Sequence, residues 1–92
     1  MVLNIRRLES FLKDYLDLSN EEKAKVEKAL RLLIENTRHP SLQVKRIQGT
    51  SNIWEARVDL KQRITFQWNS NLLILRRIGN HDIVNKEAKR GD

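Results

Sequence analysis

The chain has 92 residues, the length of one small domain. It carries 18 Lys and Arg residues against 12 Asp and Glu residues, which gives a formal net charge of +6 at pH 7. It contains no cysteine, so a disulfide framework, a thiolate nucleophile and a cysteine-based zinc site are excluded. We therefore expect a single domain over residues 1–92 that is stabilised by packing alone or with the help of a partner.

No apolar segment of the sequence is long enough to cross a membrane. The longest apolar run is residues 72–75, whereas a membrane-spanning helix needs about 20 residues. The amino terminus reaches Arg6 and Arg7 after five residues and does not resemble a secretory signal. We expect a cytoplasmic protein that does not bind membranes.

The excess positive charge is concentrated in one part of the chain. Residues 1–38 hold eight basic and seven acidic side chains, whereas residues 39–92 hold ten basic and five acidic ones. A basic half on a small domain indicates a polyanionic or strongly acidic partner. The alternative is a charged surface that only keeps the protein soluble.

The first part of the sequence predicts a short strand followed by two helices. Residues 1–5 alternate weakly, as an edge strand does, and residues 8–16 carry apolar side chains at helical spacing. Ser19 and Glu22 have the spacing of a capping box, which marks the start of a second amphipathic helix over residues 20–36. Two helices joined by so short a break form a helical hairpin.

After the second helix the apolar period changes from 3.6 to 2. Strands are predicted over residues 42–47, 54–58, 63–68 and 72–78, and residues 81–92 are polar and partly helical. Because the connections have hairpin length, these four strands should form an antiparallel meander with the helical hairpin on one face. The predicted fold class is α+β, with the element order βααββββ.

Alternation assigns the strand residues to two faces of the sheet. The apolar set should pack under the helices: Trp54, Ala56, Val58, Ile64, Phe66 and Trp68. The opposite set should share an uncovered face: Glu55, Arg57, Arg63, Thr65 and Gln67.

This predicted open face suits phosphate groups. Guanidinium groups such as those of Arg57 and Arg63 offer planar, bidentate donors to phosphate oxygens. Further basic residues that would extend an RNA-binding surface are Lys45, Arg46, Lys61, Arg76 and Arg77. The alternative is that Glu55 pairs with arginines across the strands and only solvates the sheet.

His81 directly follows the last predicted strand. Its imidazole titrates near neutrality and could act as a general acid or base, although a histidine in a turn is also often a cap or an exposed residue. Asp82 could orient the imidazole or cap a final helix, and His39 shapes a turn. The two histidines form no metal motif, and there is no glycine-rich phosphate loop, so we expect neither a metal nor a cofactor.

Five segments together resemble the RelE/ParE toxin superfamily. They are residues 39–42, 45–49, 54–58, 63–66 and 78–82. The resemblance implies a toxin of a type II toxin–antitoxin system whose partner is a cognate antitoxin. It also implies a RelE-like, metal-free endonuclease that cuts messenger RNA on the ribosome, where the ribose 2′-hydroxyl attacks the adjacent phosphate.

The resemblance also implies roles for individual residues. Arg63 matches the arginine that stabilises the phosphate, and Arg57 matches a basic position on the preceding strand. His81 occupies a position where relatives carry an arginine or a catalytic histidine. Glu55 falls where some relatives have a lysine, and Asn85 stands near the place of a tyrosine that many ribosome-dependent relatives carry. Two alternatives stay open: a ParE-like inhibitor of DNA gyrase, and an inactive relative that only binds an antitoxin.

Overall fold

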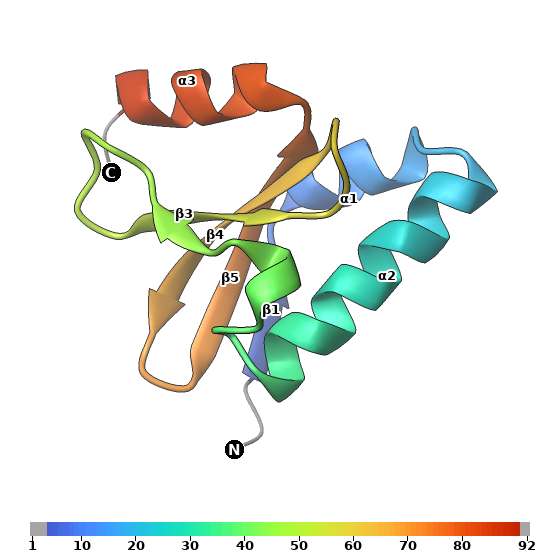
Figure 1. Cartoon of the computed structure of the whole chain (residues 1–92). Helices are drawn as coiled ribbons and strands as arrows, with labels where there is room; N and C mark the ends of the chain where they lie inside the picture. The colour runs from blue at the N-terminus through green and yellow to red at the C-terminus, as the bar shows by residue number, and fades with distance from the viewer. Residues whose placement is uncertain (1–3, 91–92) are drawn as a thin grey trace.

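The computed structural model describes residues 4–90, of which Arg90 is described in its backbone only. Within this range five strands, three α-helices and a short 3-10 helix follow one another along the chain (Figure 1). Their bounds are β1 (Asn4–Arg7), α1 (Glu9–Leu16), α2 (Asn20–Glu35), η1 (Pro40–Leu42), β2 (Lys45–Arg46), β3 (Ile53–Arg57), β4 (Arg63–Asn69), β5 (Leu72–Gly79) and α3 (His81–Arg90).

The strands form one mixed sheet in the order β1-β5-β4-β3-β2. The last four strands pair antiparallel to one another, whereas β1 runs parallel to β5. The α+β class and the meander are therefore confirmed. The strand expected over residues 1–5 is found at Asn4–Arg7, and its first three predicted residues lie outside the described part of the chain.

The predicted strand over residues 42–47 is mostly wrong. Residues 40–42 form a 3-10 turn instead, and β2 is only two residues long. Pro40 is the first residue of this turn, and His39 caps it: the His39 ring accepts a hydrogen bond from the Ser41 amide. Gln43 then adopts φ of 46°, a left-handed conformation that interrupts an extended chain.

Helices α1 and α2 cover one face of the sheet, as expected for the hairpin. The buried cluster there joins the two helices to β3, β4 and β5; its largest members are Phe11, Leu33, Leu42, Ile64, Phe66, Leu73 and Leu75. Helix α2 begins with a complete capping box, in which the Ser19 hydroxyl accepts from the Glu22 amide at 3.1 Å and the Glu22 carboxylate accepts from the Ser19 amide at 3.0 Å. The hydrogen bond that the Glu22 carboxylate accepts from the Ser19 amide is the largest cause that lowers the pKa of Glu22.

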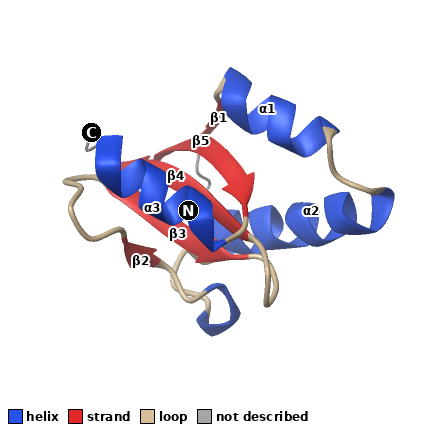
Figure 2. Cartoon of the chain, turned by 90° about the horizontal axis from the view of Figure 1, so that it is seen from above, coloured by secondary structure: helices blue, strands red, loops and turns tan. Residues whose placement is uncertain are grey.

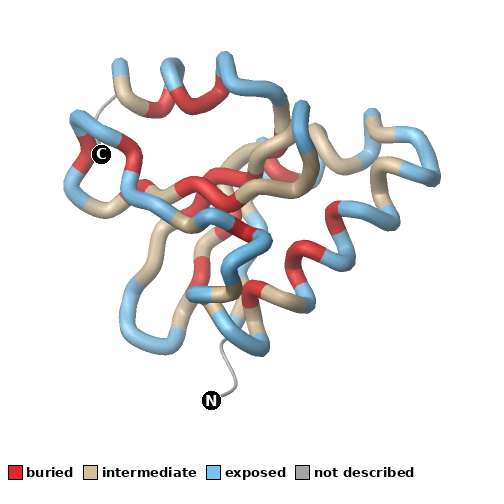
Figure 3. The backbone as a smooth tube through the Cα atoms, in the orientation of Figure 1, coloured by how far each residue is buried: buried red, intermediate tan, exposed pale blue. Residues whose placement is uncertain are grey.

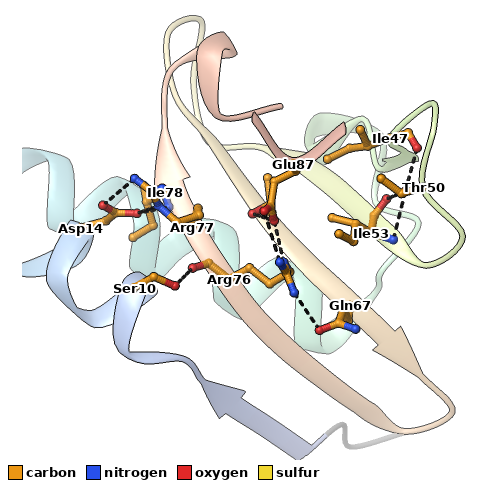
Figure 4. Close-up of polar contacts among 11 residues, drawn as sticks. Ser10, Asp14, Ile47, Thr50, Ile53, Gln67, Arg76, Arg77, Ile78 and Glu87 are labelled. Atoms are coloured by element: carbon orange, nitrogen blue, oxygen red, sulfur yellow. Dashed lines mark hydrogen bonds and ion pairs between the residues drawn. The ribbon is translucent and has the colours of Figure 1, made fainter. Parts of the chain in front are cut away.

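Helix α1 also completes the edge of β5 beyond the end of β1. The Leu8 amide donates to the Leu75 carbonyl at 3.0 Å, and the Ser10 hydroxyl donates to the Arg76 carbonyl at 2.6 Å (Figure 4). One turn later, the Asp14 carboxylate accepts from the Ile78 amide at 2.9 Å. Backbone and side-chain groups of residues 8–14 thus replace a neighbouring strand, which positions α1 against the sheet.

The second face of the sheet is not open, contrary to the prediction. Figures 1 and 2 place α3 on the side of the sheet away from α2, and Figure 3 shows that its inward residues are buried. A second apolar cluster lies beneath it, formed by Ile47, Ile53, Ile83 and Val84. Thr65 is 0% exposed and Glu55 is 6% exposed, so both are buried rather than displayed to solvent.

The turn from β5 into α3 requires glycine. A Cβ at Gly79 would lie 2.7 Å from Cγ2 of Ile83, which is closer than packed atoms approach. The helix therefore folds back tightly onto the strand that precedes it. Among residues 4–90, no helix combines the length and apolar character needed to span a membrane.

Candidate functional site

A groove of about 540 Å³ lies between α3 and the edge of the sheet. Its walls come from β2 with the loop that follows, from β3 and from the side of α3 that borders that loop. The lining residues are Lys45, Arg46, Ile47, Gln48, Gly49, Glu55, His81, Val84, Asn85 and Ala88. Four of the residues singled out from the sequence therefore meet here, together with Asn85.

His81 is the first residue of α3 and is exposed at the groove. Asn85 follows one helical turn later, so the two side chains share a face of the helix. Asn80, rather than Asp82, caps the helix, because its side-chain oxygen accepts from the Asp82 amide at 2.9 Å. The imidazole therefore stands at the mouth of the groove on a capped helix terminus.

Glu55 forms the acidic part of the groove. Its carboxylate lies 3.2 Å from Nε of Arg63 on β4, and the Glu55 side chain is only 8% exposed. Arg63 does not line the groove itself; it stands behind Glu55. Its Nη1 is buried and has no hydrogen-bond partner within the described chain. The cross-strand pair that the sequence left as an alternative is thus formed, directly beside the groove.

Lys45 and Arg46 supply the positive charge of the groove. Both are exposed residues of the short strand β2, and β2 pairs with β3 so that Lys45 stands opposite Glu55. Arg46 donates a hydrogen bond to the carbonyl of Thr50. Thr50 in turn donates its hydroxyl to the Ile47 carbonyl at 2.8 Å (Figure 4), which closes the loop between β2 and β3.

Arg57 and Lys61 are placed elsewhere. Arg57 lines a separate pocket between α2, η1 and the end of β3, and its Nε donates to the Asp59 carbonyl at 3.4 Å. Lys61 is exposed in the loop between β3 and β4. The groove therefore brings together Glu55 and His81 but not Arg57. The role that the resemblance implies for Arg57 and the expected use of Lys61 in RNA binding stay predictions.

Arg76 and Arg77 are neighbours on β5, and each is held by a carboxylate from a helix (Figure 4). Nε of Arg76 lies 2.6 Å from Glu87 on α3, and Nε of Arg77 lies 2.7 Å from Asp14 on α1. The hydrogen bond to Asp14 raises the pKa of Arg77. Both guanidinium groups bind helices to the sheet, and their use in RNA binding stays a prediction.

Glu87 is the residue that sequence reasoning missed. Its carboxylate is buried and also accepts from the Thr65 hydroxyl at 3.1 Å. The available signal was its spacing: Ile83, Val84 and Glu87 lie on one face of a helix, so the acid belongs to the inward stripe. From sequence alone, an acidic residue in a polar carboxyl-terminal stretch is predicted to be solvent-exposed unless its arginine partner is already known.

The groove combines groups suited to proton transfer and to anion binding. An imidazole and a carboxylate face a space bordered by two cationic side chains, and an Arg63 guanidinium stands next to them. Among the described residues, no group of three or more His, Cys, Asp or Glu side chains is arranged to hold a metal ion. Cationic side chains such as these suit a phosphate, and an imidazole with a carboxylate suits proton transfer.

Several solved structures share this arrangement of strands and helices. A chain of the Escherichia coli DinJ–YafQ toxin–antitoxin complex aligns over 90% of this chain and 97% of its own length, with a TM-score of 0.75 and 22% sequence identity. YafQ from E. coli strain BL21(DE3) aligns over 89% and 97% of the two chains, with a TM-score of 0.74 and 21% identity. The chain has the RelE-like toxin fold.

The RelE-like toxin fold extends to archaeal proteins. The RelE–RelB complex from Pyrococcus horikoshii OT3 aligns over 87% of this chain and 96% of that chain, with a TM-score of 0.70 and 13% identity. No family model matches the sequence, and no curated protein matches it. At these identities the likeness concerns the backbone, so the chemistry has to be argued from the groove of this chain.

Proposed function

We propose that this protein is the toxin of a type II toxin–antitoxin system and acts as a RelE-like, ribosome-dependent mRNA endonuclease. The observation that carries the proposal is the groove in which His81, Glu55, Lys45 and Arg46 meet. The RelE-like toxin fold supports it, since the chain aligns almost end to end with toxins solved alone and with antitoxins.

In the proposed reaction, the ribose 2′-hydroxyl loses its proton and its oxygen attacks the adjacent phosphorus. A 2′,3′-cyclic phosphate forms, the bond from phosphorus to the 5′-oxygen breaks, and that oxygen takes up a proton. His81 acts as the acid or base, with Glu55 as the carboxylate beside it. Lys45 and Arg46 hold the RNA backbone at the rim, and Arg63 adds positive charge next to the phosphate.

The proposal is tested by inducing wild type, His81→Ala and Arg63→Ala in cells and by primer extension on translated messages. We expect loss of His81 to slow cleavage by roughly 10²–10⁴-fold and loss of Arg63 by roughly 10²–10³-fold. Lys13→Ala is the control, because Lys13 is exposed on α1 and its ion pair within residues 4–90 is the exposed one with Glu9 at 3.7 Å. Undiminished cleavage by both variants would overturn the roles, and no cleavage by wild type would overturn the activity.

An antitoxin is the proposed protein partner, and the ribosome places the proposed activity in the cytoplasm. The neighbours crystallised with DinJ and RelB support such a partner. We expect an acidic, apolar segment that folds on binding to this basic domain. Isothermal titration with the product of the adjacent reading frame tests this, and a dissociation constant far above nanomolar would count against the pair.

Asn85 favours a second candidate function. It lines the groove near the position where the resemblance implies a tyrosine in ribosome-dependent relatives. A ParE-like inhibitor of DNA gyrase, or a relative that only binds an antitoxin, does not need a tyrosine at this position. A supercoiling assay separates these functions: inhibited gyrase with intact messages supports the second, and unaffected growth at high expression supports an inactive relative.

A further inference from the structure

A second pocket, of about 250 Å³, lies on the side of the sheet covered by α2. We call it the basic pocket; its floor is formed by Ala29 and Leu32 of α2, by Leu42 of η1 and by Val58 after β3. Ala29 and Leu42 are buried in the main core, and Leu32 and Val58 pack against that core. The floor is therefore a rigid, aliphatic surface.

The rim of the basic pocket carries positive charge. Lys25, Lys28 and Arg57 stand around it with a single acidic side chain, Asp59. Nζ of Lys25 lies 3.5 Å from the Asp59 carboxylate, while Lys28 is exposed and forms no ion pair within residues 4–90. Within the same residues, the Arg57 guanidinium makes one long hydrogen bond, from Nε to the Asp59 carbonyl at 3.4 Å. Two cations are thus available to an incoming anion.

The loop beside the basic pocket is fixed and presents an apolar side chain. The Asp59 carboxylate accepts from the amides of Lys61 and Gln62, each at 2.8 Å, and the Gln62 amide group donates to Glu22 on α2 at 3.1 Å. Leu60 lies inside this fixed turn and is 82% exposed. A leucine held in water by a rigid turn adds apolar contact area next to the pocket.

The side chains that line the basic pocket favour an acidic peptide over a nucleic acid as the anionic partner. No aromatic side chain lines it, so it offers no surface on which a nucleobase would stack. An aliphatic floor under two available cations instead fits a peptide that alternates aliphatic and acidic side chains.

We propose that the basic pocket binds an acidic, aliphatic segment of a partner protein. A carboxylate of that segment pairs with Lys28 and Arg57, and an aliphatic side chain covers Leu32 and Val58. The inference rests on the proposed function only in naming the antitoxin as the carrier of this segment. Because the pocket and the His81 groove are lined by different residues, a peptide bound here leaves His81 accessible.

The test uses a fluorescein-labelled peptide of twelve residues made of Glu and Leu, and a second one in which every Leu is replaced by Ser. Binding to the full chain is followed by fluorescence anisotropy, and the bound residues are located by amide chemical shifts. We expect Lys28→Glu and Arg57→Glu to weaken binding of the Leu peptide by about tenfold each. Lys13→Glu makes the same change of charge on α1 and should alter it less than about twofold.

The Ser peptide should bind at least about tenfold more weakly than the Leu peptide, with shifts at residues 28, 32, 57 and 58 only for the latter. If Lys13→Glu weakened binding of the Leu peptide as much as Lys28→Glu does, the inference would be overturned, because the binding would then be non-specific attraction between charges. Shifts centred on His81 would overturn it as well. A single-stranded RNA that displaces the peptide from residues 28 and 57 would assign the pocket to RNA.

These outcomes are separable from those of the proposed function. Thermal unfolding followed by circular dichroism shows whether each variant is folded at the assay temperature. Selective peptide binding by a wild-type protein that leaves messages intact would refute the endonuclease and keep the pocket. Cleavage that depends on His81, in a protein that does not bind the Leu peptide, would refute the pocket and keep the endonuclease.

Discussion

Two neighbouring arginines on β5 bind two different layers of the molecule. Arg76 reaches Glu87 on α3 with Nε at 2.6 Å and Nη2 at 3.3 Å, and Arg77 reaches Asp14 on α1 at 2.7 and 3.3 Å. Neighbouring residues of a strand point to opposite faces of the sheet, so the two side chains reach opposite layers. A β-bulge lies at this point, because Thr65 pairs with Arg77 and Phe66 with Leu75, which leaves Arg76 as the extra residue on β5. The two contacts have the same geometry but differ in burial.

The difference in burial shows how each helix is attached. The side chain of Glu87 is 3% exposed, whereas that of Asp14 is 19% exposed. Helix α1 is also held by Phe11 in the main core and by backbone hydrogen bonds along β5. Among the described residues, the buried apolar contacts of α3 are those of the small cluster around Ile83 and Val84, and Glu87 adds a hydrogen bond from Thr65. We therefore expect the ion pair to contribute more to the attachment of α3 than to that of α1.

Glu87→Ala should have the largest effect. It leaves Arg76 as a part-buried charge without its carboxylate, which typically costs about 3–5 kcal/mol. Because Glu87 joins α3 to β5 and α3 buries few apolar side chains besides Ile83 and Val84, we expect the loss to fall on α3 first, which detaches while the rest of the fold stays intact. Hydrogen exchange should show lost protection in residues 83–88 and retained protection in β4. Uniform loss of protection would contradict local detachment.

Detachment of α3 should also abolish the proposed activity, since His81 and Asn85 are carried on that helix. Glu87→Gln is the matched control, because it keeps the shape and an oxygen that can accept from Thr65 while it removes the charge. We expect intermediate protection and intermediate cleavage for this variant. Full activity of Glu87→Ala would show that the groove does not depend on the attachment of α3.

Asp14→Ala should cost less, about 1–3 kcal/mol, because it leaves the Ile78 amide and the Arg77 guanidinium without their acceptor, and the Arg77 side chain is already 30% exposed to water. The free energy of unfolding, measured with urea, should fall for the whole domain in one transition. Helix α1 should keep its protection from exchange, because Phe11 stays in the core. If α1 alone lost its protection from exchange, the Asp14 contact would attach its helix in the same way as the Glu87 contact does, contrary to this prediction.

The sequence predicted the hairpin side of the molecule better than the α3 side. Apolar residues at helical spacing and the Ser19–Glu22 box locate α1 and α2 because both signals are local. Alternation in β3 and β4 likewise predicts the faces of Ala56 and Phe66 correctly. What it could not show is that a polar carboxyl-terminal segment would fold back as α3, since that depends on contacts between distant residues.

In the candidate site, too, the local features were predictable from the sequence and the contacts between distant residues were not. Local periodicity put Glu55 on one face of the sheet and His81 directly after the last strand, and the structure brings both to one groove. Arg57 and Arg63 were expected on one open surface, yet Arg57 lines the basic pocket and Arg63 pairs with Glu55. Strand alternation assigns a side to each residue, but it does not say which way a long arginine side chain bends or which acid holds it.

The amino-terminal caps of α2 and α3 should also differ in how much of the molecule they stabilise. Ser19→Ala removes one bond of a two-bond box and should cost the whole domain about 1 kcal/mol, because α2 is part of the main core. Asn80→Ala removes the single bond to Asp82 and should fray α3 without changing the main unfolding transition. Thermal unfolding and hydrogen exchange distinguish these results, and Ser19→Thr, which keeps a hydroxyl, is the control. An equal loss from Ser19→Thr would show that the hydroxyl is not the cause.

Asp59→Asn should have the smallest effect, below about 1 kcal/mol, because its partner Lys25 is well exposed. Burial raises the pKa of Asp59, but hydrogen bonds from the Lys61 and Gln62 amides and the Lys25 charge outweigh it, so the pKa lies below its usual value. The charged form is therefore favoured in the folded state. Its contribution is complete above the unfolded pKa of about 3.9 and disappears as the pH falls through the lower folded pKa. Urea unfolding should thus show wild type more stable than the variant at pH 7 and equally stable near pH 2, and a difference that persists in acid would exclude the charge as its origin.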